Sequence, residues 1–117
     1  MYILKDSLVQ VPQTISTSWV SEPLDISRIL HYSLQLGFLS ANATVTLQAS
    51  NDLNVRGFEN ASISNVQNWT TINGSSELAV GDGTGIYDVE NVGYHWVRIV
   101  VSGSMILNSA RIIGKGV

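Results

Sequence analysis

The clearest pattern in the chain is an alternation of apolar and polar residues that begins at Leu30 within residues 29–38, "ILHYSLQLGF". The apolar positions are Leu30, Tyr32, Leu34, Leu36 and Phe38. A period of two is typical of a half-buried strand. The alternative is a helical stripe through Ile26, Ile29, Leu30, Leu34 and Phe38, but it leaves Tyr32 and Leu36 off the apolar face. The alternation therefore favours a strand.

A second alternating stretch, residues 42–50, places Val45, Leu47 and Ala49 on one face and threonine, glutamine and serine on the other. Only the linker "LSAN", residues 39–42, separates it from the first stretch. A linker this short predicts an antiparallel hairpin.

The end of the chain predicts another hairpin, with strands at residues 94–102 and 105–114 and a turn at residues 102–104. In its first strand, Val97, Ile99 and Val101, with His95 at the entrance, form the predicted core face. The opposite face carries Tyr94, Trp96, Arg98 and Val100, where Arg98 is expected to lie against Trp96. That second face needs cover from another part of the chain or from a partner.

Turn-forming residues divide the middle of the chain. Asn73-Gly74 predicts a type I′ hairpin turn within residues 69–78, and "GDGTG", residues 81–85, predicts a flexible connection. The polar residues 51–68 form a long predicted loop, a length that is usually functional or includes a short element of its own.

The first quarter of the chain has two parts. Residues 14–26 are interpreted as one strand that ends at Pro23, because proline cannot donate to a strand ladder. Residues 1–13 are interpreted as either an edge strand or an arm that lies on another subunit. Altogether the pattern predicts an all-β fold, an antiparallel β-sandwich or jelly roll of about seven to eight strands, with one sandwich domain at residues 14–117.

Composition narrows the function of such a domain. Charged residues make up 13% of the 117 residues, against roughly 25% in an average soluble domain. The net charge is −3 and the six basic residues are scattered, so no basic stripe is available for nucleic acid. No apolar stretch reaches membrane-span length and the N-terminus lacks a secretory signal pattern. We therefore expect neither nucleic acid nor a membrane span.

Candidate chemistry is sparse. The chain has no cysteine, and His31 and His95 have no carboxylate two or four residues away on the same strand face. The two histidines and the acids Asp25, Asp52, Asp82 and Asp88 show no metal-ligand spacing. We therefore predict no catalytic residue, no cofactor and no metal site, and a protein that is not an enzyme.

Recognition through a surface remains. Large amphipathic side chains serve both protein interfaces and sugar platforms. The candidate interface or ligand contacts are Phe58, Trp69, Trp96 and Arg98. Trp69 directly follows the long loop and is the tryptophan expected to be most exposed.

Five blocks, in order, resemble small structural proteins of bacteriophage virions. They are "YSLQLGF", "TVTLQASND", "NWTTINGSS", "YHWVRIVVSG" and "ILNSARIIGKG", and together they cover roughly residues 30–116. The chain departs from that family at the turn "LSAN" and at residues 102–105, where a second glycine is expected. A discoidin-like carbohydrate-binding sandwich also has a related late strand.

The resemblance implies a β-sandwich subunit of a phage particle, as a head decoration, minor capsid, tail or fibre component. We accordingly expect location in the virion, contacts with other virion structural proteins, and a homo-oligomer, a trimer before a dimer. Low charge agrees with this expectation because repeated subunits bury large interfaces. A carbohydrate-binding module for host attachment, with a glycan as partner, is the alternative.

Overall fold

The computed structural model describes residues 2–8, 13–26, 29–51, 68–90 and 92–116, with the side chains of residues 2–8 left aside. Within these ranges the protein is all-β, as predicted, and has no helix. The strands are β1 (Tyr2–Leu8), β2 (Gln13–Ile15), β3 (Ser18–Val20), β4 (Leu24–Asp25), β5 (His31–Ser50), β6 (Thr70–Thr71), β7 (Glu77–Val89) and β8 (Trp96–Gly116).

All described strands belong to one antiparallel sheet, whose centre is the pair β5 and β8. Strands β1, β2, β3 and β4 pair with successive stretches of β8 on its far side. On the far side of β5 lie β7 and the short β6. The sheet therefore consists of four long paths, of which the two outer paths are broken into segments.

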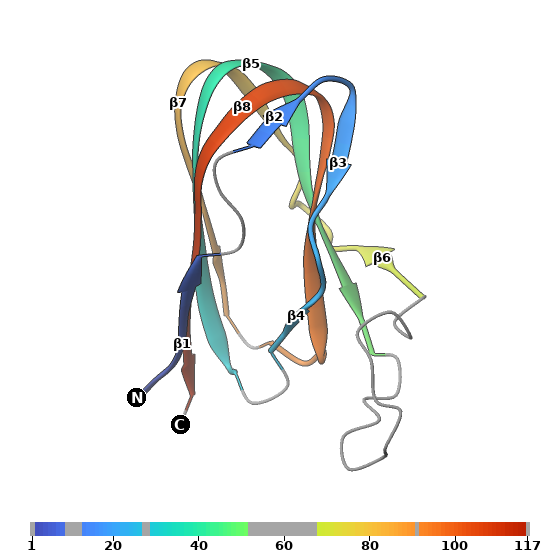
Figure 1. Cartoon of the computed structure of the whole chain (residues 1–117). Coiled ribbons are helices and arrows are strands. Elements are labelled where there is room, and N and C mark those ends of the chain that lie inside the picture. Colours follow the sequence, from blue (N-terminus) through green and yellow to red (C-terminus); the bar gives the residue numbers. More distant parts are fainter. Residues whose placement is uncertain (1, 9–12, 27–28, 52–67, 91, 117) are drawn as a thin grey trace, which may run out of the picture.

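The long strands arch, so that the two halves of this single sheet face each other (Figure 1). The arch coincides with positive φ angles at Ser40, Gly81 and Gly103. Register irregularities between Phe38 and Ala41 fall at the same place. Such bulges bend a strand and increase its twist without ending its pairing. The predicted sandwich of separate sheets is not confirmed, because one sheet supplies both layers.

Two predicted hairpins are wrong for this reason. The segment "LSAN" lies inside β5, and residues 102–104 lie inside β8. Each long strand keeps the same neighbour before and after the bend, since β5 and β8 pair from His31–Lys115 to Ser50–Trp96. Small residues and a positive φ occur both where a strand bends and where the chain reverses into a hairpin. The local sequence therefore does not distinguish a bend from a hairpin turn.

Two further segments that were predicted as turns differ from the prediction in the structure. The segment "GDGTG" is part of β7 and contains the bend at Gly81. At residues 72–75 a turn does form, with Ser75 N–H donating to the Ile72 carbonyl at 3.1 Å. Among the described residues of that turn only Gly74 has a positive φ, as in a type II turn, and β6 and β7 both pair with β5. The predicted type I′ hairpin is therefore wrong.

The predicted single strand at residues 14–26 is three short ones, β2, β3 and β4. It breaks once where the path crosses the bend, and there Gly103 N–H donates to the Thr17 carbonyl at 2.8 Å. It breaks again around Pro23, as proline requires. Residues 2–8 form β1, an outer strand on β8.

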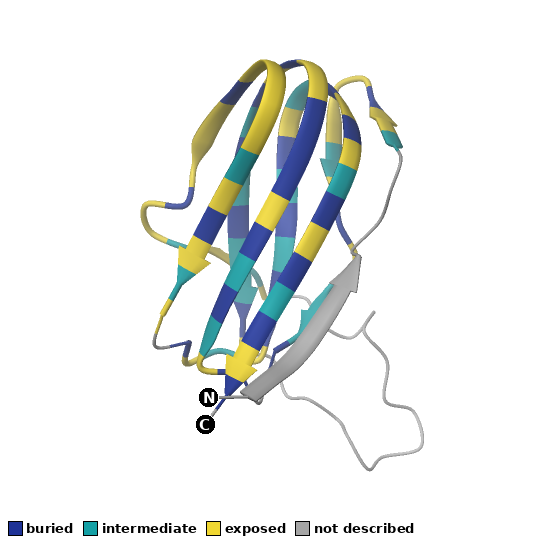
Figure 2. Cartoon of the chain, turned by 90° about the vertical axis from the view of Figure 1, so that its left-hand side faces the viewer, coloured by how far each residue is buried: buried dark blue, intermediate teal, exposed yellow. Residues whose placement is uncertain are grey.

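The core lies between the two halves of the sheet. Buried and exposed residues alternate along the long strands, as Figure 2 shows. The most deeply buried side chains include Tyr32, Leu34, Leu36, Leu47, Val97, Ile99, Val101, Leu107 and Ile112. The predicted apolar face of residues 29–38 is thus confirmed from Tyr32 to Phe38, and the helical alternative is wrong. Leu30 is the exception, at 42% exposure just before β5 begins.

Two hydrogen bonds made by tyrosine hydroxyls join the sheet halves. Tyr87 donates to the Val45 carbonyl at 3.1 Å, and the Tyr32 and Tyr94 hydroxyls lie 2.8 Å apart. Burial raises the pKa of Tyr32 and Tyr94 above the ordinary value, and that of Tyr87 to about 12. All three side chains are thereby held in the neutral form.

These tyrosines predict alkaline sensitivity. A tyrosine whose pKa is raised on folding stabilises the fold fully below its unfolded pKa near 10, and this contribution is lost as pH rises through the folded pKa. For Tyr87, ~2 kcal/mol of the free energy of unfolding should be lost by pH 12. Urea denaturation at pH 8, 10, 11 and 12 measures the loss, and Tyr87→Phe should make stability less dependent on pH in this range. An unchanged slope in that variant would contradict this account.

Candidate functional site

Two polar clusters and one open edge stand out on the outer surface of the folded sheet. The first cluster, called here the Arg98 cluster, consists of Arg98, Gln48 and Trp69. Arg98 Nε–H donates to Gln48 Oε1 at 2.8 Å, and the guanidinium carbon lies 4.3 Å from the centre of the Trp69 ring. Guanidinium groups at this distance from an indole face make a cation–π contact.

Strand register explains this cluster. Gln48 on β5 lies opposite both Arg98 on β8 and Thr71 on β6, and Trp69 immediately precedes β6. The pairing of β6 thus delivers the indole to the face that carries Arg98. Burial lowers the pKa of Arg98, although a guanidinium remains charged at any physiological pH.

The Arg98 cluster includes two of the four predicted contact residues. Trp96 is buried, at 6% exposure, and the ring found over Arg98 is Trp69, not Trp96 as predicted. Within the described part of the chain the Trp96 indole N–H has no hydrogen-bond acceptor. Phe58 and most of the predicted loop 51–68 lie outside the described residues.

The predicted faces of residues 94–101 are largely right. Val97, Ile99 and Val101 are buried in the core, but His95, predicted at its entrance, is exposed because it precedes the first residue of β8. Its backbone N–H is held instead by Asn51 Oδ1 at 3.1 Å. The opposite face is partly covered, since Tyr94, Arg98 and Val100 are half-buried.

The Arg98 cluster predicts a measurable coupling. A double-mutant cycle with Arg98→Ala and Trp69→Ala should give ~0.5–1 kcal/mol of interaction free energy at a partly exposed site. The measurement is urea denaturation of the four proteins followed by far-UV circular dichroism. Additive effects of the two substitutions would show that the stacking contributes nothing.

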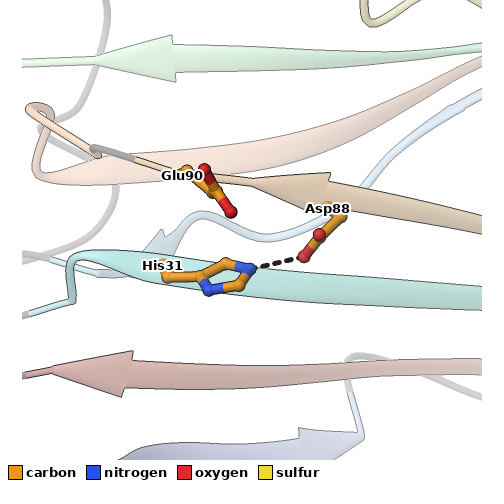
Figure 3. A group of neighbouring side chains, drawn as sticks. All are labelled: His31, Asp88 and Glu90. Carbon is orange, nitrogen blue, oxygen red and sulfur yellow. Dashed lines mark hydrogen bonds and ion pairs between the residues drawn. The ribbon is translucent and has the colours of Figure 1, made fainter. Parts of the chain in front are cut away.

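The second cluster consists of His31, Asp88 and Glu90 (Figure 3). His31 Nε2–H donates to Asp88 Oδ1 at 2.5 Å, and one donor atom from each of the three residues lies within 4.8 Å of the others. His31 begins β5, Asp88 lies near the end of the adjacent β7, and Glu90 directly follows the last residue of β7. Sequence spacing gave no sign of this cluster, because His31 and Asp88 are 57 residues apart.

A shallow hollow of about 400 Å³ adjoins the second cluster, lined by His31, Ser33, Ile86, Asp88, Ile113 and Lys115. Three strands contribute to it, and their register places Ser33 beside both Asp88 and Ile113. Its wall thus combines an acid, an imidazole, an ammonium group and two aliphatic side chains. Such a wall offers hydrogen bonds and charge at a largely open surface.

The open edge belongs to β7, which pairs only with β5 among the described residues. Three large apolar side chains of β7 lie in solvent: Leu78 at 81%, Val80 at 71% and Ile86 at 60% exposure. A hollow of about 70 Å³ lies along β7 between the two sheet halves, with Leu36, Phe38 and Val45 in its lining. The signal in the sequence is the run "ELAV", residues 77–80, where apolar residues occupy both faces.

Comparison with known proteins assigns no family. No protein-family model matches the chain, and no curated protein matches it in sequence. A search of the described residues for a helix suited to cross a membrane finds none. The arguments about function therefore rest on the surfaces described above.

Proposed function

We propose that the chain is a structural bacteriophage virion protein that assembles on the capsid or tail through protein–protein contacts. The observation that supports this most is the open β7 edge. Exposed edge strands carry unpaired N–H and C=O groups and are usually blunted by charge, proline or cover. β7 carries three acidic residues, but beside them the exposed Leu78, Val80 and Ile86 offer apolar area for a neighbouring subunit.

The occupant we propose is a second copy of the chain, with its β1 strand beside β7. β1 is the strand at the other side of the sheet, paired with β8, so β7-to-β1 contacts can repeat head to tail. Contacts of this kind close into rings when the rotation permits, which matches the expected homo-oligomer.

In this proposal the folded sheet acts as a sandwich-type subunit of a repetitive particle. Backbone pairing between edges supplies affinity, and many weak contacts on a lattice add through avidity. The chain contains only 15 charged side chains, six basic and nine acidic, so its copies repel one another little. The sequence resemblance to phage structural proteins agrees with this proposal.

Density-gradient purification of phage particles tests membership of the virion. An antibody against the chain should detect many copies in the particle band, and these should resist a salt wash. Absence of the chain from purified particles, with abundant free protein in the lysate, would contradict the proposal.

The second candidate is carbohydrate binding for host attachment. It is favoured by the Arg98 cluster, where an indole lies beside a guanidinium and a side-chain amide. Sugar recognition uses such a mixture of aromatic surface and hydrogen-bonding groups. Binding should quench tryptophan fluorescence in the native protein but not in Trp69→Ala, and a blank glycan array would count against it.

A further inference from the structure

We propose that His31, Asp88 and Glu90 form a binding site for a divalent transition-metal ion such as Zn²⁺. The sequence predicted no metal site because these residues have no ligand spacing along the chain. Their convergence comes from the sheet, in which residues 31–33 of β5 lie beside the end of β7. The cluster adjoins the end of β7 that carries Ile86, but its three donor residues are not the apolar side chains on which the proposed function rests.

The distances fit a single ion. Tetrahedral ligands about 2.1 Å from zinc lie roughly 3.4 Å from one another. The present donor atoms range from the 2.5 Å contact of His31 with Asp88 up to at most 4.8 Å. Rotation of an exposed carboxylate is enough to even out these distances, and the Asp88 side chain is 59% exposed.

The backbone preorganises the site. Asp88 lies in β7 and Glu90 directly follows the strand, and this two-residue spacing brings both carboxylates within 4.8 Å of a His31 ring nitrogen. The pairs Tyr32–Val89 and Ser33–Asp88 place His31 beside this end of β7. Figure 3 shows the three side chains gathered at one place, with the imidazole of His31 directed at the Asp88 carboxylate and Glu90 beside them. A metal ion would take the place of the proton that His31 now donates to Asp88.

The donor set selects the kind of ion. Imidazole is a good ligand for zinc, cobalt and nickel, whereas magnesium and calcium prefer sites made of oxygen atoms alone. One imidazole and two carboxylates supply three ligands, and a fourth position is left to water or to an external group. We therefore expect zinc or cobalt to bind far more tightly than magnesium.

Lys115 supplies an internal test. It pairs with His31 across β5 and β8 and lines the same hollow, so its ammonium group opposes a bound cation. Replacing Lys115 with glutamine removes that charge while retaining a side chain of similar length. Zinc affinity should rise a few-fold in this variant, because repulsion between exposed charges is modest.

Isothermal titration calorimetry of the full chain with ZnCl₂ and MgCl₂ tests the proposal. We expect one zinc ion per chain, affinity at least tenfold weaker in His31→Ala and in Glu90→Gln, and tighter binding in Lys115→Gln. His95→Ala is the control, since His95 is the second histidine of the chain, is exposed and lies outside the cluster. Circular dichroism of each variant confirms that it is folded.

A visible absorption band of bound Co²⁺ gives a second readout that does not depend on heat. Its loss in His31→Ala, and its retention in His95→Ala, would support the site. The proposal is overturned by a native protein that binds neither zinc nor cobalt, by equal affinity for zinc and magnesium, or by binding that is lost only in His95→Ala.

Discussion

Replacement of Gly103 by alanine is expected to lower the free energy of unfolding by ~3 kcal/mol or more, from backbone strain and overpacking combined. Gly103 has a φ of 123°, which L side chains rarely adopt. A Cβ atom there would also contact the Asn42 carbonyl oxygen and lie 2.7 Å from Ala43 Cα. These atoms are backbone of the paired strand β5 and cannot move without disturbing the bend.

Gly85→Ala is the matched control for this prediction. Gly85 also lies within a long strand, but a Cβ there meets no heavy atom within 4 Å. We expect its effect to stay within about 1 kcal/mol, as for substitutions that break no special feature. Urea denaturation followed by tryptophan fluorescence measures both variants. Equal stability of Gly103→Ala and Gly85→Ala would mean that β8 does not bend where we place it.

The second large effect is expected for Leu47→Ala, which should cost ~2–5 kcal/mol because truncation of a buried leucine leaves a cavity. Leu47 is fully buried between the sheet halves. Its backbone is also held firmly, since Ile72 N–H donates to its carbonyl at 2.9 Å. The surroundings are therefore poorly placed to collapse into the space.

Leu78→Ala is the control for Leu47→Ala. It makes the same substitution at a leucine of β7 that is 81% exposed, so the two variants differ in burial. At protein concentrations low enough to keep copies apart, its substitution should change the free energy of unfolding by less than about 0.5 kcal/mol. Thermal and urea unfolding of both variants give the difference. Similar losses in Leu47→Ala and Leu78→Ala would contradict the burial pattern of the folded sheet.

Alternation along the chain predicted which residues are buried, because it depends only on the two-residue period of a strand. Tyr32, Leu34 and Leu36 on β5, and Val97 and Ile99 on β8, were identified in this way. The path of the strands was not predictable by the same means. A glycine or serine with positive φ is compatible with a reversal or with a bend, and only long-range pairing decides between them.

The surface clusters were even less accessible from sequence. Arg98 and Trp69 come together through the two-residue strand β6, which has no pattern of its own. His31 and Asp88 meet because β7 runs antiparallel to β5 in one particular register. A shift of one residue would turn Asp88 to the other face, so no local motif could reveal the contact.

Folding a single sheet over itself has a consequence for assembly. It buries a core without closing the sheet, so β1 and β7 each pair on one side only among the described residues. On β7 that open side coincides with the exposed Leu78 and Val80. The folded sheet thus encloses the core of its own subunit and leaves an edge strand to which a neighbouring subunit can bind.

Sedimentation velocity of the full chain, compared with Val80→Lys and Val20→Lys, tests the proposed assembly most directly. Both valines are exposed on outer strands, at 71% and 47%, but only Val80 lies on β7. We predict a concentration-dependent oligomer for the native chain and for Val20→Lys, and a monomer for Val80→Lys. A native chain that remains monomeric at all concentrations, or an oligomer that Val80→Lys leaves intact, would contradict assembly through the β7 edge.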